Sequence, residues 1–126
     1  MMPPLVLLVE DIEDNLVLIK SLLEMADFRV VEARDGREAI TQAQAHNPDL
    51  ILLDMSLPEV DGWTVARTLR QMPEFGSTLI VALTAHTMPG DREKTLDAGC
   101  DEFLTKPVDV PNFLSTINKI LERKGG

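Results

Sequence analysis

Three short runs of apolar residues restrict the possible folds of this chain more than any other feature. Every position in residues 5–9, 50–53 and 79–83 is hydrophobic. Strands that are covered on both faces have this pattern, and such strands are typical of parallel sheets. Two more mixed segments, residues 28–32 and 102–105, are predicted as strands nearer the edges of the same sheet.

Helical patterns lie between and after these strands. Asp35 is predicted to begin a helix, with Glu38 three residues later as its capping-box partner. Two more helices are expected at about residues 14–26 and 62–72. The last helix has the clearest pattern, because its apolar residues recur at helical spacing: Val110, Phe113, Leu114, Ile117, Ile120 and Leu121.

One further helix is predicted near residues 88–98. Pro89 suits its first turn and Gly99 suits a C-terminal cap. Met88 and Leu96 are its main apolar anchors, so we expect this helix to pack loosely and to shift at little cost in free energy.

The order is therefore strand then helix, five times. This alternation implies a parallel sheet with right-handed crossovers and helices on both faces. We predict a doubly wound, flavodoxin-like α/β fold with strand order 2-1-3-4-5, formed by residues 1–126 as one domain with loose ends at 1–4 and 124–126. Ligands of such sheets bind beyond the carboxyl ends of strands 1 and 3, where the order reverses.

Composition excludes several classes of protein. With 126 residues, 44% of them hydrophobic, the chain can bury one core. A formal net charge of −9 argues against nucleic acid and anionic membrane surfaces as partners, and no apolar run approaches the ~20 residues of a membrane span. A single cysteine, Cys100, fits a reducing, cytoplasmic setting.

Polar side chains follow the predicted strands at one edge of the sheet. Glu10 and Asp11 follow the first strand, Asp54 the third, Thr84 the fourth and Lys106 the fifth. Since the carboxyl ends of parallel strands meet at one edge, we expect three carboxylates, a hydroxyl and an ammonium group to gather there.

Such a carboxylate cluster requires compensation. Two unit charges at a separation of about 4 Å repel by about 4 kcal/mol at an effective dielectric of about 20. A hard divalent cation with oxygen ligands, Mg²⁺ above all, would relieve this repulsion. The lysine and threonine could then contact an anion that arrives with the metal, and phosphate is the expected anion.

The whole chain resembles the receiver domain of two-component response regulators. The motifs that carry the resemblance are the acidic pair Glu10-Asp11, Asp54 at the end of an apolar strand, and three dipeptides: Asp61-Gly62, Thr84-Ala85 and Lys106-Pro107. The resemblance implies that Asp54 accepts a phosphoryl group from a phosphohistidine on a sensor histidine kinase or histidine phosphotransfer protein. It also implies signalling by contact with a downstream protein rather than turnover as an enzyme.

Roles for the surrounding residues follow from the same resemblance. Asp11 would bind Mg²⁺ directly and Glu10 through water, with Asp54 and the backbone carbonyl of Ser56 as further ligands. Lys106 and Thr84 would contact the phosphoryl group. Thr84 and Phe103 would act as the switch that alters the face formed by the fourth helix, fifth strand and fifth helix. The bond from Lys106 to Pro107 is expected to be cis, and Ser56 and His86 occupy positions that tune dephosphorylation in the family.

Three settings for this chemistry are considered. The expected one is a stand-alone receiver. The second is a receiver that belongs to a hybrid histidine kinase, which would have the same chemistry. The third and most remote is a Mg²⁺-dependent phosphatase of the haloacid dehalogenase type, but that class needs a second aspartate two residues after the nucleophile, where this chain has Ser56.

Overall fold

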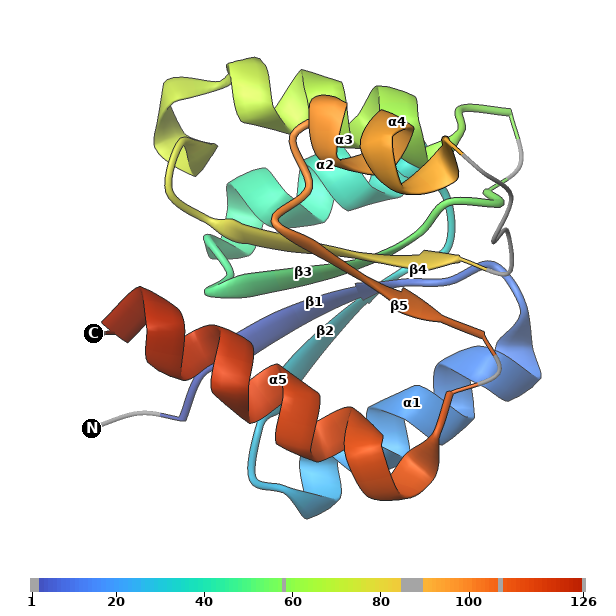
Figure 1. Ribbon diagram of the computed structural model, residues 1–126, viewed down its shortest axis with the longest axis vertical. Helices are drawn as coiled ribbons and strands as arrows, with labels where there is room; N and C mark the ends of the chain where they lie inside the picture. The colour runs from blue at the N-terminus through green and yellow to red at the C-terminus, as the bar shows by residue number, and fades with distance from the viewer. Residues whose placement is uncertain (1–2, 58, 85–89, 107, 126) are drawn as a thin grey trace.

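Five parallel strands form one sheet in the order β2-β1-β3-β4-β5 (Figure 1). The computed structural model describes residues 3–57, 59–84, 90–106 and 108–125, apart from the side chains of 91, 92, 110 and 123–125. The observed order is the predicted one. The strands are β1 (Leu5–Val9), β2 (Arg29–Ala33), β3 (Leu50–Asp54), β4 (Leu79–Thr84) and β5 (Glu102–Thr105).

Helices cover both faces of the sheet. In Figure 1, α1 and α5 lie below the sheet, and α2, α3 and α4 lie above it. The α-helices are α1 (Glu13–Met25), α2 (Gly36–His46), α3 (Gly62–Gln71), α4 (Asp91–Asp97) and α5 (Val110–Gly125), and the 3₁₀ turn η1 (Pro73–Phe75) follows α3. No helix in the described ranges is long and apolar enough to cross a membrane.

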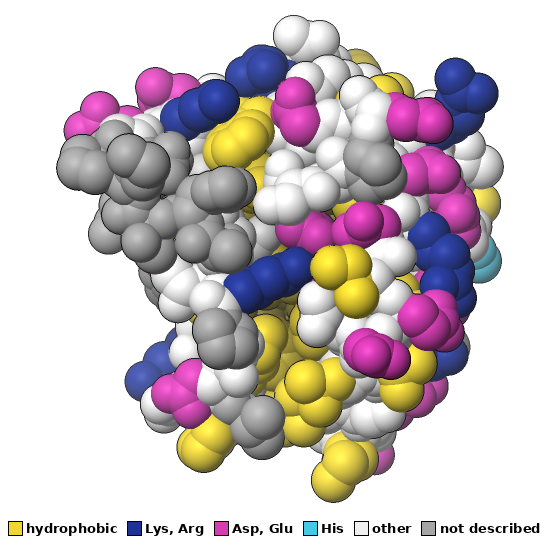
Figure 2. Space-filling model, turned by 90° about the vertical axis from the view of Figure 1, so that its right-hand side faces the viewer, with side chains coloured by type: hydrophobic (Ala, Val, Ile, Leu, Met, Phe, Trp, Pro, Cys, Tyr) yellow, Lys and Arg dark blue, Asp and Glu magenta, His cyan; other side chains and the backbone are white. Residues whose placement is uncertain are grey.

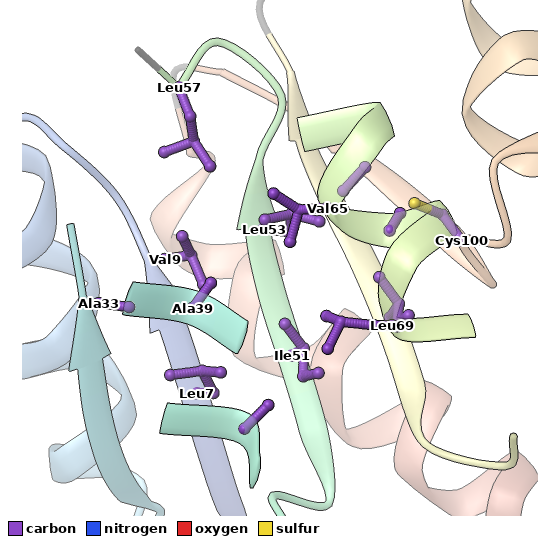
Figure 3. Packing of buried hydrophobic residues seen from close by; sticks show 14 of the residues in the cluster. Leu7, Val9, Ala33, Ala39, Ile51, Leu53, Leu57, Val65, Leu69 and Cys100 are labelled. Atoms are coloured by element: carbon purple, nitrogen blue, oxygen red, sulfur yellow. The ribbon is translucent and has the colours of Figure 1, made fainter. Parts of the chain in front are cut away.

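Alternate residues of each central strand enter two separate cores. Leu7 and Ile51 point toward α2 and α3 (Figure 3), whereas Leu8 and Leu52 point toward α1 and α5. This two-sided burial explains why the three central strands are apolar at every position.

Several strand and helix boundaries differ from those predicted by one to three residues, and two of these differences have a clear structural cause. β2 begins at Arg29 rather than at residue 28, because Phe28 closes the end of α1 through a hydrogen bond from its N–H to the Leu23 carbonyl. The fourth helix begins at Asp91 rather than near 88, because Gly90 has a left-handed φ of +92°. Pro89 and Met88 lie outside the described residues.

The packing of α4 also differs from the prediction. Leu96, expected as an apolar anchor, is 38% exposed, and the polar neighbour Thr95 is buried instead. The predicted C-terminal cap is confirmed, since Gly99 has φ +107°. At α2, Asp35 caps the first turn by accepting a hydrogen bond from Glu38 N, as predicted.

Backbone contacts continue near both ends of the described chain. Pro4 O and Pro3 O accept hydrogen bonds from the backbone N–H and the side-chain Nε of Arg29. α5 continues through Gly125, and the loose termini at 1–4 and 124–126 stay a prediction. The head of the chain thus extends the pairing of β1 with β2.

Candidate functional site

The carboxyl edge of the sheet gathers the acidic residues that follow β1 and β3. A carboxylate oxygen from each of Glu10, Asp11 and Asp54 can be chosen so that all lie within 4.8 Å of one another. Figure 2 looks onto this edge and shows acidic side chains beside a basic one at the centre of the face. The predicted clustering of these three side chains is therefore observed.

Two of the three carboxylates are buried. Glu10 is fully buried and Asp54 is 1% exposed, whereas Asp11 is exposed. Glu10 N donates to the Ala33 carbonyl at 3.0 Å, which continues the β1–β2 pairing by one residue and holds the side chain under the edge. Because Asp11 is the exposed member, the cluster is open to solvent on the Asp11 side.

Lys106 lies between the two buried carboxylates. Its Nζ atom is 2.8 Å from Glu10 Oε1 and 3.1 Å from Asp54 Oδ2. The other Asp54 oxygen, Oδ1, accepts a hydrogen bond from Ser56 N at 2.9 Å. Both oxygens of Asp54 are thus held in place, one by a backbone N–H and the other by an ammonium group.

Burial and neighbouring charges shift the pKa values of Glu10 and Lys106. The pKa of Glu10 rises to about 7, first because burial disfavours the charged form and then because Asp54 is close, although Lys106 opposes the rise. For Lys106, burial acts to lower the pKa, but the hydrogen bond with Glu10 and the charges of both carboxylates outweigh burial and raise it. The site therefore holds a charged lysine and an acid that titrates near neutral pH.

The predicted switch residues lie on neighbouring strands. Thr84 ends β4 and is buried, and its carbonyl accepts a hydrogen bond from Lys106 N at 2.9 Å. Phe103 on β5 pairs in register with Ala82, and its half-buried ring packs against the core beneath α3. Thr84 is thus connected through the backbone to the lysine, one strand away from Phe103.

Three predicted features of the site stay predictions. Ser56 lies in the loop after β3 and contacts Asp54 through its backbone N–H. The role of its carbonyl as a metal ligand stays a prediction. His86 and the expected cis bond at Pro107 lie outside the described residues.

Sequence reasoning did not anticipate two features of the site. The position of Lys106 directly between Glu10 and Asp54 depends on side-chain conformation, which no sequence pattern specifies. The close approach at Gly62 could have been suspected from the Asp61-Gly62 dipeptide. A Cβ at position 62 would lie 2.7 Å from the Asp54 carbonyl oxygen and 2.6 Å from Met55 Cα.

Comparisons with known proteins agree with this geometry. The family model of the response regulator receiver domain matches residues 6–118. The chain is 40% identical over 120 residues to the polar-differentiation response regulator DivK of Brucella anthropi, covering 95% of this chain and 98% of DivK.

Solved structures resemble the chain over nearly all of its length. Chemotaxis response regulator CheY4 of Vibrio cholerae is 28% identical with a TM-score of 0.89, covering 94% of this chain and 98% of CheY4. The receiver domain of sensor histidine kinase PA1611 from Pseudomonas aeruginosa is 34% identical with a TM-score of 0.85, covering 98% of this chain and 99% of that one. The latter was solved with a magnesium ion coordinated in its active site cleft.

Proposed function

Because the chain belongs to the response regulator receiver domains of two-component signalling, we propose that it accepts a phosphoryl group on Asp54. The donor would be a phosphohistidine on a sensor histidine kinase or histidine phosphotransfer protein. An Asp54 carboxylate oxygen attacks phosphorus, the P–O bond forms and the P–N bond to the imidazole breaks. The observation that carries this proposal is the buried Asp54 carboxylate at the end of β3, held by Ser56 N and Lys106 Nζ.

The acidic cluster fits a divalent cation. Glu10, Asp11 and Asp54 offer oxygen ligands within 4.8 Å of one another, and Mg²⁺ prefers oxygen ligands from a few carboxylates. These three residues, with the Ser56 carbonyl, would hold the ion. When bound, Mg²⁺ would neutralise charge on the phosphoryl oxygens.

Lys106 and Thr84 would receive the new group. Lys106 Nζ already lies beside Asp54 Oδ2 and would pair with a phosphoryl oxygen. Thr84 would hydrogen-bond the phosphoryl group, and Phe103 would adjust with it. This rearrangement would change the face of α4, β5 and α5, to which a downstream protein would bind.

We infer further that residues 1–126 act as one receiver domain in the cytoplasm. Its chemistry would be limited to phosphorylation and dephosphorylation of its own aspartate, without turnover of an external substrate. Support comes from Ser56, which occupies the position where a phosphatase of the haloacid dehalogenase type needs an acidic residue.

Mass spectrometry after incubation with Mg²⁺ and acetyl phosphate tests the proposal. We expect one added phosphoryl group, lost in alkali because an acyl phosphate hydrolyses readily. Asp54→Asn should abolish it, whereas Asp61→Asn, which changes an exposed acid at the start of α3, should leave it in place. An adduct that survives Asp54→Asn, or no adduct with the natural sequence, would refute the proposal.

A receiver that belongs to a hybrid histidine kinase is the second candidate. The similarity to the receiver domain of sensor histidine kinase PA1611, at 34% identity, favours it, while the similarity to DivK at 40% favours the single-domain setting. The length of the intact open reading frame distinguishes the two, because only the hybrid kinase encodes catalytic kinase domains in the same chain.

A further inference from the structure

Trp63 joins α3 to α4. Its indole N–H donates a hydrogen bond of 3.1 Å to Thr95 Oγ1, and Lys94 Nζ lies 3.9 Å from the centroid of the indole ring. Thr95 is only 2% exposed. A part-buried hydrogen bond and a cation–π contact therefore hold the middle of α4 against the first turn of α3.

Other described side chains of α4 contribute little to its attachment. Among residues 93–97, whose side chains the structure describes, Thr95 alone is buried, and the apolar Leu96 is 38% exposed. Burial of an apolar face normally supplies most of the free energy that attaches a helix to its domain. Among the described side chains of α4, those that contact Trp63 therefore supply a large part of the attachment of this helix.

The α3 end of the contact is fixed to the strand that bears Asp54. Trp63 directly follows Gly62, whose N–H donates to the Met55 carbonyl at 3.3 Å. A Cβ at position 62 would lie 2.7 Å from the Asp54 carbonyl oxygen. Because backbones packed this closely move together, a displacement at Asp54 would be transmitted to Trp63.

The C-terminal end of α4 is held by a different and stronger attachment. Arg70 donates to the Gly99 carbonyl from Nε at 3.0 Å and from Nη2 at 2.7 Å, and to Asp101 Oδ2 at 2.9 Å. Its Nη1 atom donates to three more carbonyls, those of Phe75, Gly76 and Thr78. The helix thus has a firm attachment just beyond its C-terminal end and a lighter one at Thr95, an arrangement that permits pivoting about the C-terminal end.

We propose that Trp63 is a latch that holds α4 in the arrangement of Figure 1, and that this latch sets how readily phosphorylation of Asp54 moves α4. The dependence on phosphorylation of Asp54 rests on the proposed function. The contact of Trp63 with α4 does not depend on it. If the phosphoryl group favours released α4, weakening the latch raises the released population and tightens the apparent binding of phosphoryl analogues by the same factor.

Hydrogen exchange measures the latch without reference to phosphorylation. Thr95→Val removes the hydrogen bond with little change in volume, and Trp63→Phe removes its donor while also shortening the ring system. Thr68→Val is the matched control, because it removes a threonine hydroxyl that bonds the Thr64 carbonyl within α3. We expect the amides of residues 91–98 to exchange about five-fold faster in both latch variants, because each variant loses about one hydrogen bond that holds α4. Unchanged exchange in those variants, or an equal increase in Thr68→Val, would overturn the latch.

Beryllofluoride with Mg²⁺ then tests the link to the phosphorylation site. Trp63 is the only tryptophan, so its fluorescence reports the titration in the natural sequence and in Thr95→Val. We expect about five-fold tighter apparent binding in Thr95→Val, and unchanged binding in Thr68→Val. Faster exchange with unchanged binding would overturn the regulatory role. If the natural sequence neither binds beryllofluoride nor gains a phosphoryl group, the proposed function fails, and hydrogen exchange alone decides the latch.

Discussion

Lys106 Nζ lies 2.8 Å from Glu10 Oε1, and the same atom is 3.1 Å from Asp54 Oδ2. One ammonium group thus joins two buried carboxylates that follow β1 and end β3. The exposed carboxylate of Asp11 adds a further negative charge at the same edge. One cation against three carboxylates leaves negative charge uncompensated, and this imbalance underlies the first two predictions.

Replacing Lys106 with Met should destabilise the protein. The change removes the cation between Glu10 and Asp54 and leaves two buried carboxylates facing each other. Since breaking a buried ion pair exposes the remaining charge to an unfavourable environment, we expect the free energy of unfolding at pH 8 without Mg²⁺ to fall by about 2–3 kcal/mol. Urea denaturation measures this change.

The control for this prediction is Lys119→Met. Lys119 is an exposed lysine on α5, so its loss should change the free energy of unfolding by less than about 0.5 kcal/mol. Equal effects of the two substitutions would show that Lys106 does not compensate the carboxylates.

Glu10 should make stability and Mg²⁺ binding depend on pH. Its pKa in the folded protein is about 7, against an ordinary value of 4.5. Between these values the folded state binds more protons than the unfolded state, so stability falls as pH rises from 4.5 to 7. A cation requires the ionised carboxylate and should therefore release a proton when it binds near neutral pH.

The expected result is a larger rise in melting temperature with Mg²⁺ at pH 8 than at pH 5.5. Calorimetric titration at pH 6.5 in buffers of different ionisation enthalpy measures the released proton directly. In Glu10→Gln the proton release should disappear, because the amide cannot titrate. An equal Mg²⁺ effect at both pH values would contradict the assignment of the raised pKa to the metal cluster.

The sequence predicts the central strands of this molecule better than it predicts α4. β1, β3 and β4 are recognisable because burial on both faces requires an apolar residue at every position. The start of α4 was predicted too early, because the left-handed conformation of Gly90 ends helical geometry there. Leu96 was wrongly expected to anchor α4, since a helix of seven residues gives too short a pattern for its buried face to be identified.

The site likewise has a part that the sequence predicts and a part that it does not. Glu10, Asp11 and Asp54 could be placed together because parallel strands end at one edge. The bridge made by Lys106 and the Trp63–Thr95 contact depend on side-chain conformations across long stretches of sequence. Arg70 likewise bonds carbonyls up to 29 residues away, and no local pattern indicates such partners.

Gly62→Ala should disturb both the fold and the acceptor. The added Cβ would lie 2.6 Å from Met55 Cα and 2.7 Å from the Asp54 carbonyl oxygen. Since these neighbours are backbone atoms, β3 or α3 must shift, and we expect a loss of about 1–3 kcal/mol in the free energy of unfolding together with slower phosphorylation by acetyl phosphate.

Gly76→Ala is the matched control for the same chemical change. Its Cβ would lie 3.5 Å from the Pro73 carbonyl oxygen, which is an ordinary van der Waals contact, and Gly76 has an ordinary φ of −60°. Stability should be unchanged or slightly higher. If Gly62→Ala changes the free energy of unfolding as little as Gly76→Ala, the close packing of Gly62 against Asp54 is not required for stability.

Cys100 should be unreactive in the folded protein. Burial first, and the charge of Asp101 second, raise the pKa of its thiol to about 12, and only the thiolate reacts with alkylating reagents. At pH 8 we expect iodoacetamide to modify the folded protein about a thousand-fold more slowly than the urea-unfolded chain. Cys100 N also donates to the Thr95 carbonyl at 3.3 Å, so labelling reports on the end of α4. Thr95→Val and Thr68→Val should both leave the rate in the folded protein low, because Arg70 holds Gly99 and Asp101 on either side of Cys100. Rapid labelling of the natural sequence would show that this part of the core opens freely.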